Sequence, residues 1–363
     1  MSYFKHKVYG ILFNLFKHTK IDEKSVSFII DSRESFKGNL DYIKKEFEKR
    51  GDYKFHFFYK DKLSFGSFKK LAGSKYIFLN DNFFPLAFMN FKDENTIVQL
   101  WHAPGASKKF GGSVDIESRD ILKKISENTD YLIVTSDKIK GYYSEAFQMP
   151  ESKIKALGLP RMDYYFENHD LDKIKEGFLK RYNISQDKKI ILYAPTFRDE
   201  SKFNNVFDYL NLNKFNEVFS DEYVLALRLH PKIKNFYQDD ISSRGQYVDV
   251  SDFESEQELM LISDILITDY SSIFFDFAYL KKPLIYYQYS NDYHYDSQNG
   301  YFQYKTMGFG PVIDNEEELV EKIVEYIEKD CKMEDIYKNR VNEFFKYHDK
   351  NNSKRCYEWI LKH

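Results

Sequence analysis

The sequence predicts an α/β protein with two open parallel sheets and a cleft between them. Short apolar runs, which are typical of buried parallel strands, alternate with longer amphipathic stretches that are typical of helices. Such alternation favours parallel sheets with helices on both faces. It stops in the polar, lysine-rich segment 162–188 and then starts again. Since 363 residues also exceed the usual size of one domain, we expect two domains.

The first half is predicted to contain six strands and three helices. We expect strands at 26–30, 53–59, 76–79, 96–101, 131–135 and 154–157. We expect helices at 34–50, 118–127 and 138–147. Segment 162–188 is then predicted to form a helix that bridges the two halves.

The second half repeats the alternation and ends in helices. We expect strands at 190–194, 223–229, 247–250, 265–267 and 284–287. We expect helices near 207–219, 256–261 and 271–280, then at 315–329, 333–347 and 351–361. The predicted parts are therefore an amphipathic helix at 1–20, domains at 21–168 and 169–340, and a C-terminal helix at 341–363.

The amino-acid composition and net charge exclude several classes of protein. The apolar content of 42% is ample for packed cores, and the net charge of −3 gives no argument for nucleic acid. The two cysteines, Cys331 and Cys356, support neither a disulfide framework nor a cysteine metal site, and they fit a reducing cytoplasm. No apolar run approaches the ~20 residues that a membrane-spanning helix needs.

The N-terminal segment has one apolar helical face surrounded by lysines. The apolar residues are Phe4, Val8, Ile11, Leu12 and Leu15, and the lysines are Lys5, Lys7, Lys17 and Lys20. Such a helix either lies on an anionic bilayer or packs on its own domain. A signal peptide is disfavoured, because the apolar run is short and no small-residue cleavage site follows it.

Chemically distinctive residues follow the predicted strands, at the point where each strand ends. They occupy 101–106, 158–161, 194–199, 228–231 and 268–272, and so come from both halves. Ligands of open α/β sheets bind outside the carboxyl ends of the strands. We therefore expect one shared site in the cleft between the halves.

His102 follows a strand and precedes a Pro-Gly turn that exposes it. A histidine there can take a proton from an alcohol near neutral pH, although a purely structural role is the alternative. Lys108 and Lys109 could attract an anionic acceptor or could be a solvated surface pair.

A phosphate-binding site is predicted where a helix begins at Ser271 and Ser272, because the free N–H groups and the dipole at the start of a helix favour anions. Arg161, Arg228 and His230 add positive donors, so a diphosphate ligand is favoured over separate pairing of each with a carboxylate. Asp276 is predicted to accept hydrogen bonds from hydroxyl groups that the phosphate carries. The alternative makes Ser271 an ordinary N-cap and leaves Asp269 and Asp276 solvated.

Missing motifs also restrict the chemistry. The sequence has no G-x-G-x-x-G at the first helix, no P-loop, no H-E-x-x-H and no compact acidic cluster. We therefore expect no cofactor and no metal, with positive side chains and helix ends neutralising the phosphates. Tyr293, Tyr295 and Tyr301, in the aromatic stretch 286–304, either line the cleft or pack in the core.

Taken together, the motifs resemble those of the CDP-glycerol glycerophosphotransferase family of teichoic acid synthesis over about residues 20 to 330. The matching blocks are 99–102 with Lys108 and Lys109, 158–163, 193–199, 228–231, 264–276 and 299–301. The resemblance implies a GT-B-like fold of two Rossmann-type domains whose parallel sheets face a central cleft.

The resemblance also implies roles for individual residues. His102 matches the general base, and His230, with Arg228 and Leu229, matches a block that contacts the donor phosphates. The other positions that match substrate-binding residues are Ala103, Pro104, Gly105, Ala106, Arg161, Pro195, Thr196, Ser271, Ser272 and Asp276.

The implied reaction is attack of an acceptor hydroxyl on the β-phosphorus of CDP-glycerol, with release of CMP. Ala103 stands where many members have glycine, and the long N-terminal extension of many polymerases is absent; both favour priming on undecaprenyl-diphosphate-linked GlcNAc-ManNAc. The expected location is peripheral, at the cytoplasmic face of the cell membrane. Alternatives are a polymerase or CDP-ribitol-using member, a nucleotide-sugar glycosyltransferase, and a non-catalytic nucleotide- or membrane-binding protein.

Overall fold

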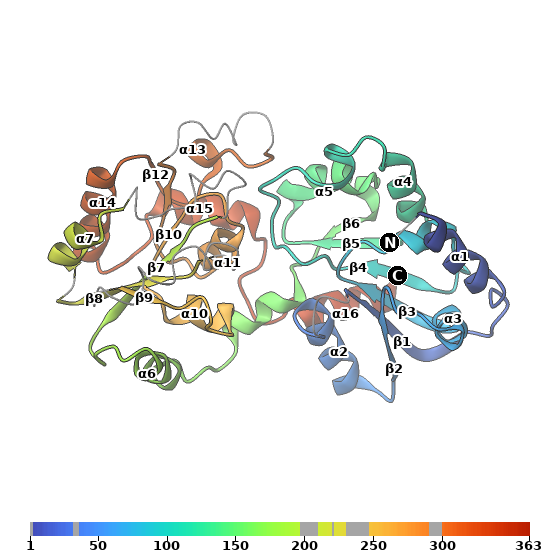
Figure 1. Cartoon of the computed structure of the whole chain (residues 1–363). Coiled ribbons are helices and arrows are strands. Elements are labelled where there is room, and N and C mark those ends of the chain that lie inside the picture. Colours follow the sequence, from blue (N-terminus) through green and yellow to red (C-terminus); the bar gives the residue numbers. More distant parts are fainter. Residues whose placement is uncertain (1–2, 32–35, 197–209, 220, 230–246, 290–299) are drawn as a thin grey trace. The chain divides into compact units, whose positions relative to one another are not determined.

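The computed structural model describes residues 3–31, 36–196, 210–219, 221–229, 247–289 and 300–363 (Figure 1). The chain forms two compact units. Unit 1 comprises residues 1–166 together with 343–363, and unit 2 comprises residues 167–342. The last helix of the chain therefore belongs to the unit that contains the N-terminus.

Unit 1 contains a six-stranded parallel sheet in the order β2-β1-β3-β4-β5-β6. The strands are β1 Asp22–Ile30, β2 Lys54–Tyr59, β3 Ser74–Leu79, β4 Thr96–Gln99, β5 Tyr131–Val134 and β6 Ile154–Ala156. In β1, Val26 lies beside Phe55 on one side and Tyr76 on the other. β1 is buried from Ser25 onward, as expected for a strand inside a sheet covered on both faces.

Helices cover both faces of this sheet (Figure 1). They are α1 Tyr3–Asn14, α2 Asn39–Arg50, α3 Phe65–Ala72, α4 Arg119–Glu127, α5 Lys140–Phe147 and α16 Asn352–Lys362. Ile29 and Ile77 share one face with Phe68 of α3. Phe78 points to the other face, where it contacts Phe47 of α2. Successive residues of a strand thus enter two different cores.

Unit 2 contains a second six-stranded parallel sheet, in the order β12-β11-β10-β7-β8-β9. Its strands are β7 Lys189–Ala194, β8 Tyr223–Leu227, β9 Tyr247–Asp249, β10 Ile265–Thr268, β11 Leu284–Tyr287 and β12 Val312–Ile313. Its helices are α6 Leu171–Arg181, α7 Leu212–Phe219, α10 Glu256–Ile262, α11 Ile273–Tyr279, α13 Tyr304–Met307, α14 Glu316–Glu328 and α15 Asp335–Phe344. The predicted α/β class with two parallel sheets is confirmed.

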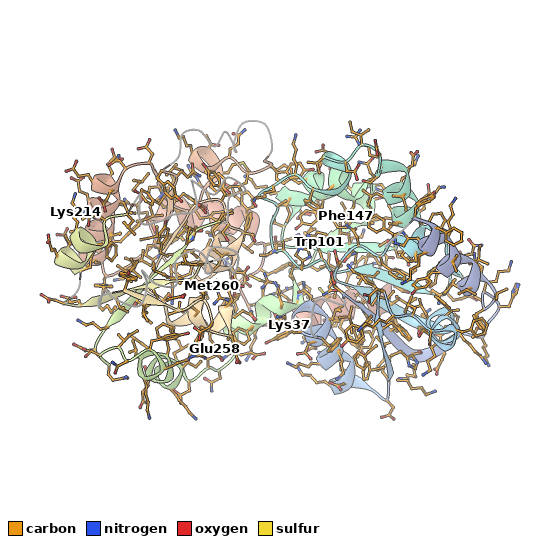
Figure 2. The ribbon with its side chains drawn as sticks, in the orientation of Figure 1. Lys37, Trp101, Phe147, Lys214, Glu258 and Met260 are labelled. Carbon is orange, nitrogen blue, oxygen red and sulfur yellow. The ribbon has the colours of Figure 1, made fainter. Side chains whose placement is uncertain are left out.

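Large side chains fill the interior of each unit (Figure 2). In unit 1, Trp101 packs edge-on against Phe147, with ring centroids 5.0 Å apart. In unit 2, Met260 of α10 is buried. Many of the described aromatic side chains, among them Phe28, Phe47 and Tyr286, are likewise buried and serve packing.

Several predicted boundaries are wrong for local reasons. The helix expected from residue 34 begins at Asn39, because Gly38 has a φ of 64° and cannot continue a right-handed helix. The expected bridging helix at 162–188 is two pieces, a 3-10 helix η5 at Pro160–Phe166 and α6, which Asp170 caps through the N–H of Lys173. Helix α3 was missed, although Ser64 and Ser67 form its capping box.

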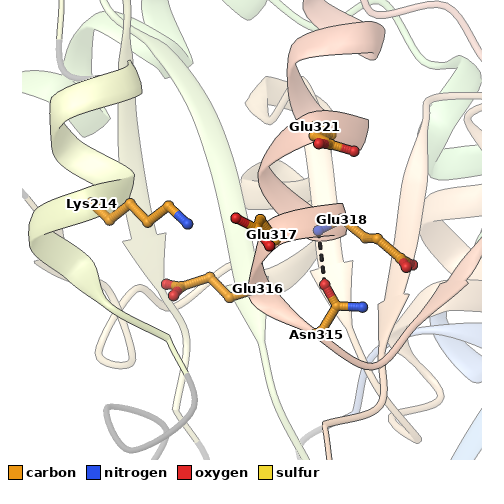
Figure 3. A pocket seen from close by; sticks show the side chains of 6 residues that line it. All are labelled: Lys214, Asn315, Glu316, Glu317, Glu318 and Glu321. Carbon is orange, nitrogen blue, oxygen red and sulfur yellow. Dashed lines mark hydrogen bonds between the residues drawn. The ribbon is translucent and has the colours of Figure 1, made fainter.

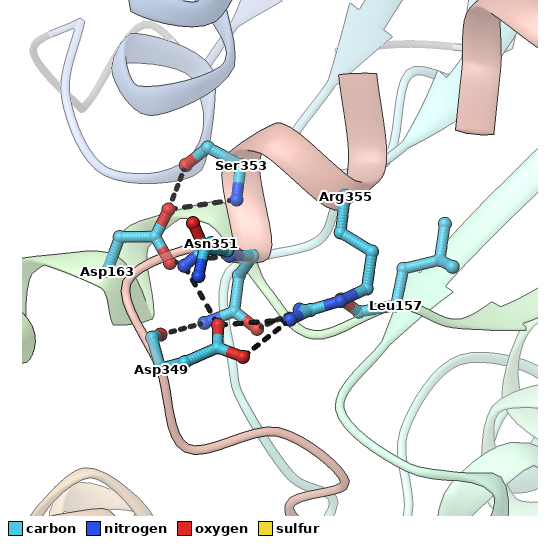
Figure 4. Close-up of polar contacts among 7 residues, drawn as sticks. Leu157, Asp163, Asp349, Asn351, Ser353 and Arg355 are labelled. Atoms are coloured by element: carbon cyan, nitrogen blue, oxygen red, sulfur yellow. Dashed lines mark hydrogen bonds and ion pairs between the residues drawn. The ribbon is translucent and has the colours of Figure 1, made fainter. Parts of the chain in front are cut away.

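The buried carboxylate of Asp163 fastens α16 to unit 1 (Figure 4). It accepts hydrogen bonds from the N–H of Asn352 at 2.7 Å, from the N–H of Ser353 at 2.9 Å and from the hydroxyl of Ser353 at 2.6 Å. Arg355 donates to the main-chain oxygen of Leu157 at 3.0 Å. The start of α16 is thus held by the segment that follows β6.

Helix α1 packs on unit 1 through His6, Tyr9, Gly10 and Phe13. Gly10 allows a close approach, because a Cβ atom there would lie 2.3 Å from Cβ of Phe88. The helix therefore does pack on its own domain, but the buried face is not the predicted apolar one. The opposite face leaves Phe4 74%, Ile11 65% and Leu15 65% exposed. Among the described residues, no helix is long and apolar enough to cross a bilayer.

Candidate active site

His102 lies just past β4, with its side chain exposed. Its Nδ1 atom is 3.4 Å from the main-chain oxygen of Asn80, which follows the neighbouring strand β3. A carbonyl oxygen only accepts hydrogen bonds, so this contact favours the tautomer with the proton on Nδ1. The Nε2 atom then keeps its lone pair, which is what a general base needs.

The residue before His102 has an unusual backbone conformation. Trp101 has a φ of 53°, and its ring lies 4.2 Å from the imidazole, centroid to centroid. A positive φ costs energy for a bulky residue and must be held by its surroundings. Here the N–H of Trp101 donates to Oε1 of Gln99 at 2.9 Å. The chain therefore turns sharply and directs His102 out of the core.

The loop 103–106 after His102 is held by its main-chain oxygens. Tyr143 donates to the oxygens of Ala103 at 3.1 Å and Gly105 at 3.3 Å, and Thr135 donates to that of Pro104 at 2.8 Å. Pro104, Gly105 and Ala106 are buried, while Ala103 is half-buried. These residues thus fix the shape of the loop that carries His102.

Arg161 lies beside His102, as the shared-site prediction requires within this unit. Its Nε donates to the main-chain oxygen of His102 at 3.1 Å. Its N–H donates to Oδ1 of Asn39 at 2.9 Å, and the Asn39 amide donates to the oxygen of Trp101 at 2.9 Å. Asn39 is buried and links three segments, but it was not predicted as a site residue. The Gly38-Asn39 pair, a turn signal inside a helical pattern, was the available clue.

In unit 2, Thr196 and Asp269 join the carboxyl ends of the paired strands β7 and β10. Oδ1 of Asp269 accepts hydrogen bonds from the N–H of Thr196 at 2.8 Å, its hydroxyl at 2.6 Å and the N–H of Tyr270 at 2.6 Å. Asp269 is 0% exposed and Asp276 is 6% exposed. The interpretation of these two carboxylates as solvated is therefore wrong.

The two serines of the predicted phosphate-binding site differ in their position at the helix and in their exposure. Ser272, not Ser271, is the N-cap of α11, and in the described structure its exposed side chain forms no capping hydrogen bond. Ser271 is half-buried and accepts from the N–H of Ile273 at 3.4 Å. The helix expected from residue 271 thus begins two residues later and spans seven residues.

Arg228, just after β8, is half-buried and donates to the main-chain oxygen of Phe253 at 3.0 Å. Within the described residues it forms no ion pair, so no carboxylate there neutralises its charge. Leu229 is buried in the hydrophobic core, and Pro195 is buried after β7. His230 lies outside the described residues.

The remaining candidates are surface lysines and aromatic residues. Lys108 is exposed and Lys109 half-buried. In the aromatic stretch, Tyr301, Phe302 and Tyr304 are buried, which confirms the packing interpretation for these residues. Tyr293 and Tyr295 lie outside the described residues.

A pocket of about 630 Å³ at the start of α14 is unsuited to a diphosphate (Figure 3). Four glutamates and one lysine line it, and its Asn315 caps α14 by accepting from the N–H of Glu318 at 2.9 Å. The net negative charge would repel phosphate. In the part of the chain that the structure describes, no cluster of three or more His, Cys, Asp or Glu residues could hold a metal ion.

Comparison with known proteins gives a consistent result. The family model described as CDP-Glycerol:Poly(glycerophosphate) glycerophosphotransferase matches residues 11–362. A teichoic acid poly(ribitol-phosphate) polymerase of Bacillus spizizenii is 30% identical over 88% of this chain and 54% of its own length. The chain thus spans about half of that relative.

Two further relatives are nearer to this chain in length. A teichoic acid ribitol-phosphate primase of Bacillus spizizenii is 32% identical over 82% of this chain and 77% of its own. A teichoic acid glycerol-phosphate transferase of Staphylococcus aureus is 34% identical over 66% of this chain and 68% of its own.

Among solved structures, a variant of the wall teichoic acid polymerase TagF aligns with a TM-score of 0.79 at 23% identity. The alignment covers 99% of this chain and 94% of that one. This likeness confirms the GT-B-like fold that the sequence motifs imply.

Proposed function

Because the chain belongs to the CDP-glycerol:poly(glycerophosphate) glycerophosphotransferase family, a family of teichoic acid transferases, we propose that it transfers glycerol phosphate from CDP-glycerol to a lipid-linked acceptor. The observation that carries this proposal is the geometry of His102. Its imidazole is exposed beyond the carboxyl end of β4, and Nδ1 is engaged by Asn80, which leaves Nε2 for the acceptor.

The proposed reaction is a displacement at phosphorus. Nε2 of His102 takes the proton of the acceptor hydroxyl as its oxygen bonds to the β-phosphorus of CDP-glycerol. The bond from that phosphorus to the bridging oxygen breaks, and CMP leaves with the bridging oxygen. Positive side chains stabilise the negative charge on the phosphoryl oxygens, and the candidates among the described residues are Arg161 and Arg228.

Thr196 is proposed to recognise a hydroxyl group of the donor. Its own hydroxyl already donates to Asp269, so towards a ligand its oxygen can only accept a hydrogen bond. A fully ionised phosphate oxygen offers no proton, whereas glycerol and ribose hydroxyls do. The Thr196–Asp269 pair is thereby suited to the organic part of the donor.

The proposed acceptor is undecaprenyl-diphosphate-linked GlcNAc-ManNAc, and the proposed step is the first addition. Binding at a lipid surface is supported by Phe4 and Ile11, which are exposed on the face of α1 opposite the packed one, and by Leu15, which is exposed just after the helix ends. Lys7 and Lys17 are exposed beside them and would attract anionic lipid at the cytoplasmic face of the membrane.

Ribitol phosphate transfer is a second candidate. Two relatives that cover 88% and 82% of this chain carry ribitol phosphate in their names. Glycerol and ribitol differ in length and hydroxyl number, so the donor site has to distinguish them by contacts to the polyol.

A donor panel on the purified protein tests both candidates. CDP-glycerol, CDP-ribitol and UDP-GlcNAc are each supplied with the lipid-linked disaccharide, and CMP release and product size are measured. We expect CMP release with CDP-glycerol and one addition for each acceptor. A ladder of products would contradict the priming step, preference for CDP-ribitol would favour the second candidate, and transfer from UDP-GlcNAc alone would contradict both.

A further inference from the structure

A second pocket lies in unit 1, in the loop that follows β3. Its cavity volume is about 330 Å³, and it is lined by the consecutive residues 81–85 together with His6 of α1 and Lys60 after β2. None of the predicted site residues lines this pocket.

The pocket is built from the same loop that holds the imidazole of His102. Asn80, whose oxygen contacts Nδ1 of His102, is followed directly by the lining residue Asp81. Gln99 connects the two loops, because its amide donates to the oxygen of Asp81 at 3.1 Å and its Oε1 accepts from the N–H of Trp101. A group bound in the pocket would therefore lie in a fixed relation to the proposed base.

The charge of the pocket disfavours phosphate. Lys60 forms ion pairs with Asp31, at 2.8 Å, and with Asp81. Burial by itself would lower the pKa of Lys60, but its hydrogen bonds to the two carboxylates raise it above the ordinary value. The ammonium of Lys60 is thus already paired with carboxylates, which makes it a poor site for an anion, whereas a carboxylate oxygen has several lone pairs and can accept hydrogen bonds from neutral hydroxyl groups.

The other lining groups suit a ring that carries hydroxyl or amide substituents. The side-chain amide of Asn82 forms no hydrogen bond with any described part of the chain, so its donors and its acceptor are available. Phe84 is half-buried and stacks on the imidazole of His6, with centroids 5.5 Å apart and an interplanar angle of 12°. A flat apolar ring beside hydrogen-bonding groups matches the two-sided character of a sugar.

We propose that this pocket is a subsite for a neutral sugar ring of the acceptor, held by Asp81, Asn82 and Phe84 in the loop whose Asn80 contacts His102. The proposal rests on the proposed function in one respect, namely that the sugar belongs to the acceptor. It adds a specificity site on the acceptor side, separate from the residues that contact the donor.

The test uses a neutral probe, the free disaccharide of N-acetylmannosamine and N-acetylglucosamine, without lipid or phosphate. Binding to the full chain is measured by saturation-transfer NMR at millimolar concentration. We expect Asn82→Ala to weaken binding by about 2- to 10-fold, the loss of one or two hydrogen bonds. Asn90→Ala is the matched control, because Asn90 is exposed in the same connection and outside the pocket. It should bind like the wild type.

Asn82→Asp provides a second variant that preserves the side-chain shape but removes both donors, and thermal unfolding verifies that each variant folds. Equal binding by wild type and Asn82→Ala, an equal loss of binding in Asn82→Ala and the control Asn90→Ala, or no sugar binding at all would overturn the proposal. Inorganic phosphate that binds to the wild type and is lost in Asn82→Ala would overturn the charge argument and the proposal with it.

The donor reaction separates this proposal from the proposed function. CMP release from CDP-glycerol or CDP-ribitol in water, without acceptor, should be unchanged in Asn82→Ala, while the KM for the acceptor rises. If wild type releases no CMP from either donor with acceptor present, the proposed function fails. Binding of the free disaccharide then still decides the sugar subsite by itself.

Discussion

Nδ1 of His102 lies 3.4 Å from the main-chain oxygen of Asn80, across the paired strands β3 and β4. This contact favours the tautomer of the exposed imidazole that carries the proton on Nδ1. It uses a main-chain oxygen, whose position the sheet fixes.

Replacing His102 by alanine should reduce transfer by ~10²-fold or more, because the acceptor hydroxyl loses its base. The Kd for the donor should change little. Calorimetric titration with CDP-glycerol and a radiolabelled transfer assay measure the two effects. The control His18→Ala removes an exposed histidine of the same unit and should retain full activity. Activity retained in His102→Ala would remove this residue as the base.

Asn39→Ala should lower kcat while the KM for the donor is retained, since Asn39 positions Arg161 and the main chain of Trp101. It should also cost about 1–3 kcal/mol of unfolding free energy, because buried partners lose their hydrogen bonds. Asn95→Ala is matched in burial and donates to the oxygen of Ser74 instead. A similar loss of stability with normal kcat is expected there; equal kcat losses in both variants would contradict a positioning role.

Gly158→Ala should destabilise the protein by about 2 kcal/mol or more. Gly158 has a φ of 80°, and a Cβ atom would lie 1.9 Å from Oδ1 of Asn352 at the start of α16. Gly177→Ala is the control, since a Cβ atom there meets nothing within 4 Å in helix α6. That variant should be stabilised by up to about 1 kcal/mol. Urea unfolding measures both, and equal midpoints would show that the α16 contact contributes nothing.

Ile11→Glu should weaken binding to vesicles of anionic lipid by about 10-fold or more, because it places a charge on the exposed apolar face of α1. Sedimentation with vesicles measures this. Ile336→Glu changes an equally apolar exposed residue of α15 and should bind normally. Parallel losses in the two variants would indicate nonspecific charge repulsion instead of α1 docking.

Asp252 gives a pH prediction for unit 2. The hydrogen bond from Tyr182, 2.8 Å long, and the pairing with Arg181 lower the pKa of Asp252 below its ordinary value. The ionised form is thus favoured by folding, so the stabilisation is present at neutral pH and is lost as pH falls through the lowered pKa. Because the group is exposed, the Asp252→Asn difference should be at most about 1 kcal/mol at neutral pH. Unfolding curves at pH 7 and pH 3 measure it; a difference that grows in acid would refute the assignment.

Prediction from the sequence succeeded where the information is local. The apolar runs around Phe28 and Ile267 identified central strands, and the position of His102 after a strand identified an exposed imidazole. Boundaries failed where one residue decided them, as Gly38 does for α2. The buried state of Asp269 was missed, because its partner Thr196 is 73 residues away.

The sequence by itself determined the alternation of strands and helices, the two-sheet class and the strand ends at which polar residues gather, since each depends on periodicity over a few neighbours. Only the tertiary structure decided the strand orders, the return of α16 to unit 1 and the link from Asn39 to Arg161. The hydrogen bonds that make these connections join residues 122 and 190 positions apart. Folding brings such partners together because whole helices and strands pack against one another. No local sequence pattern predicts which of these elements will be in contact.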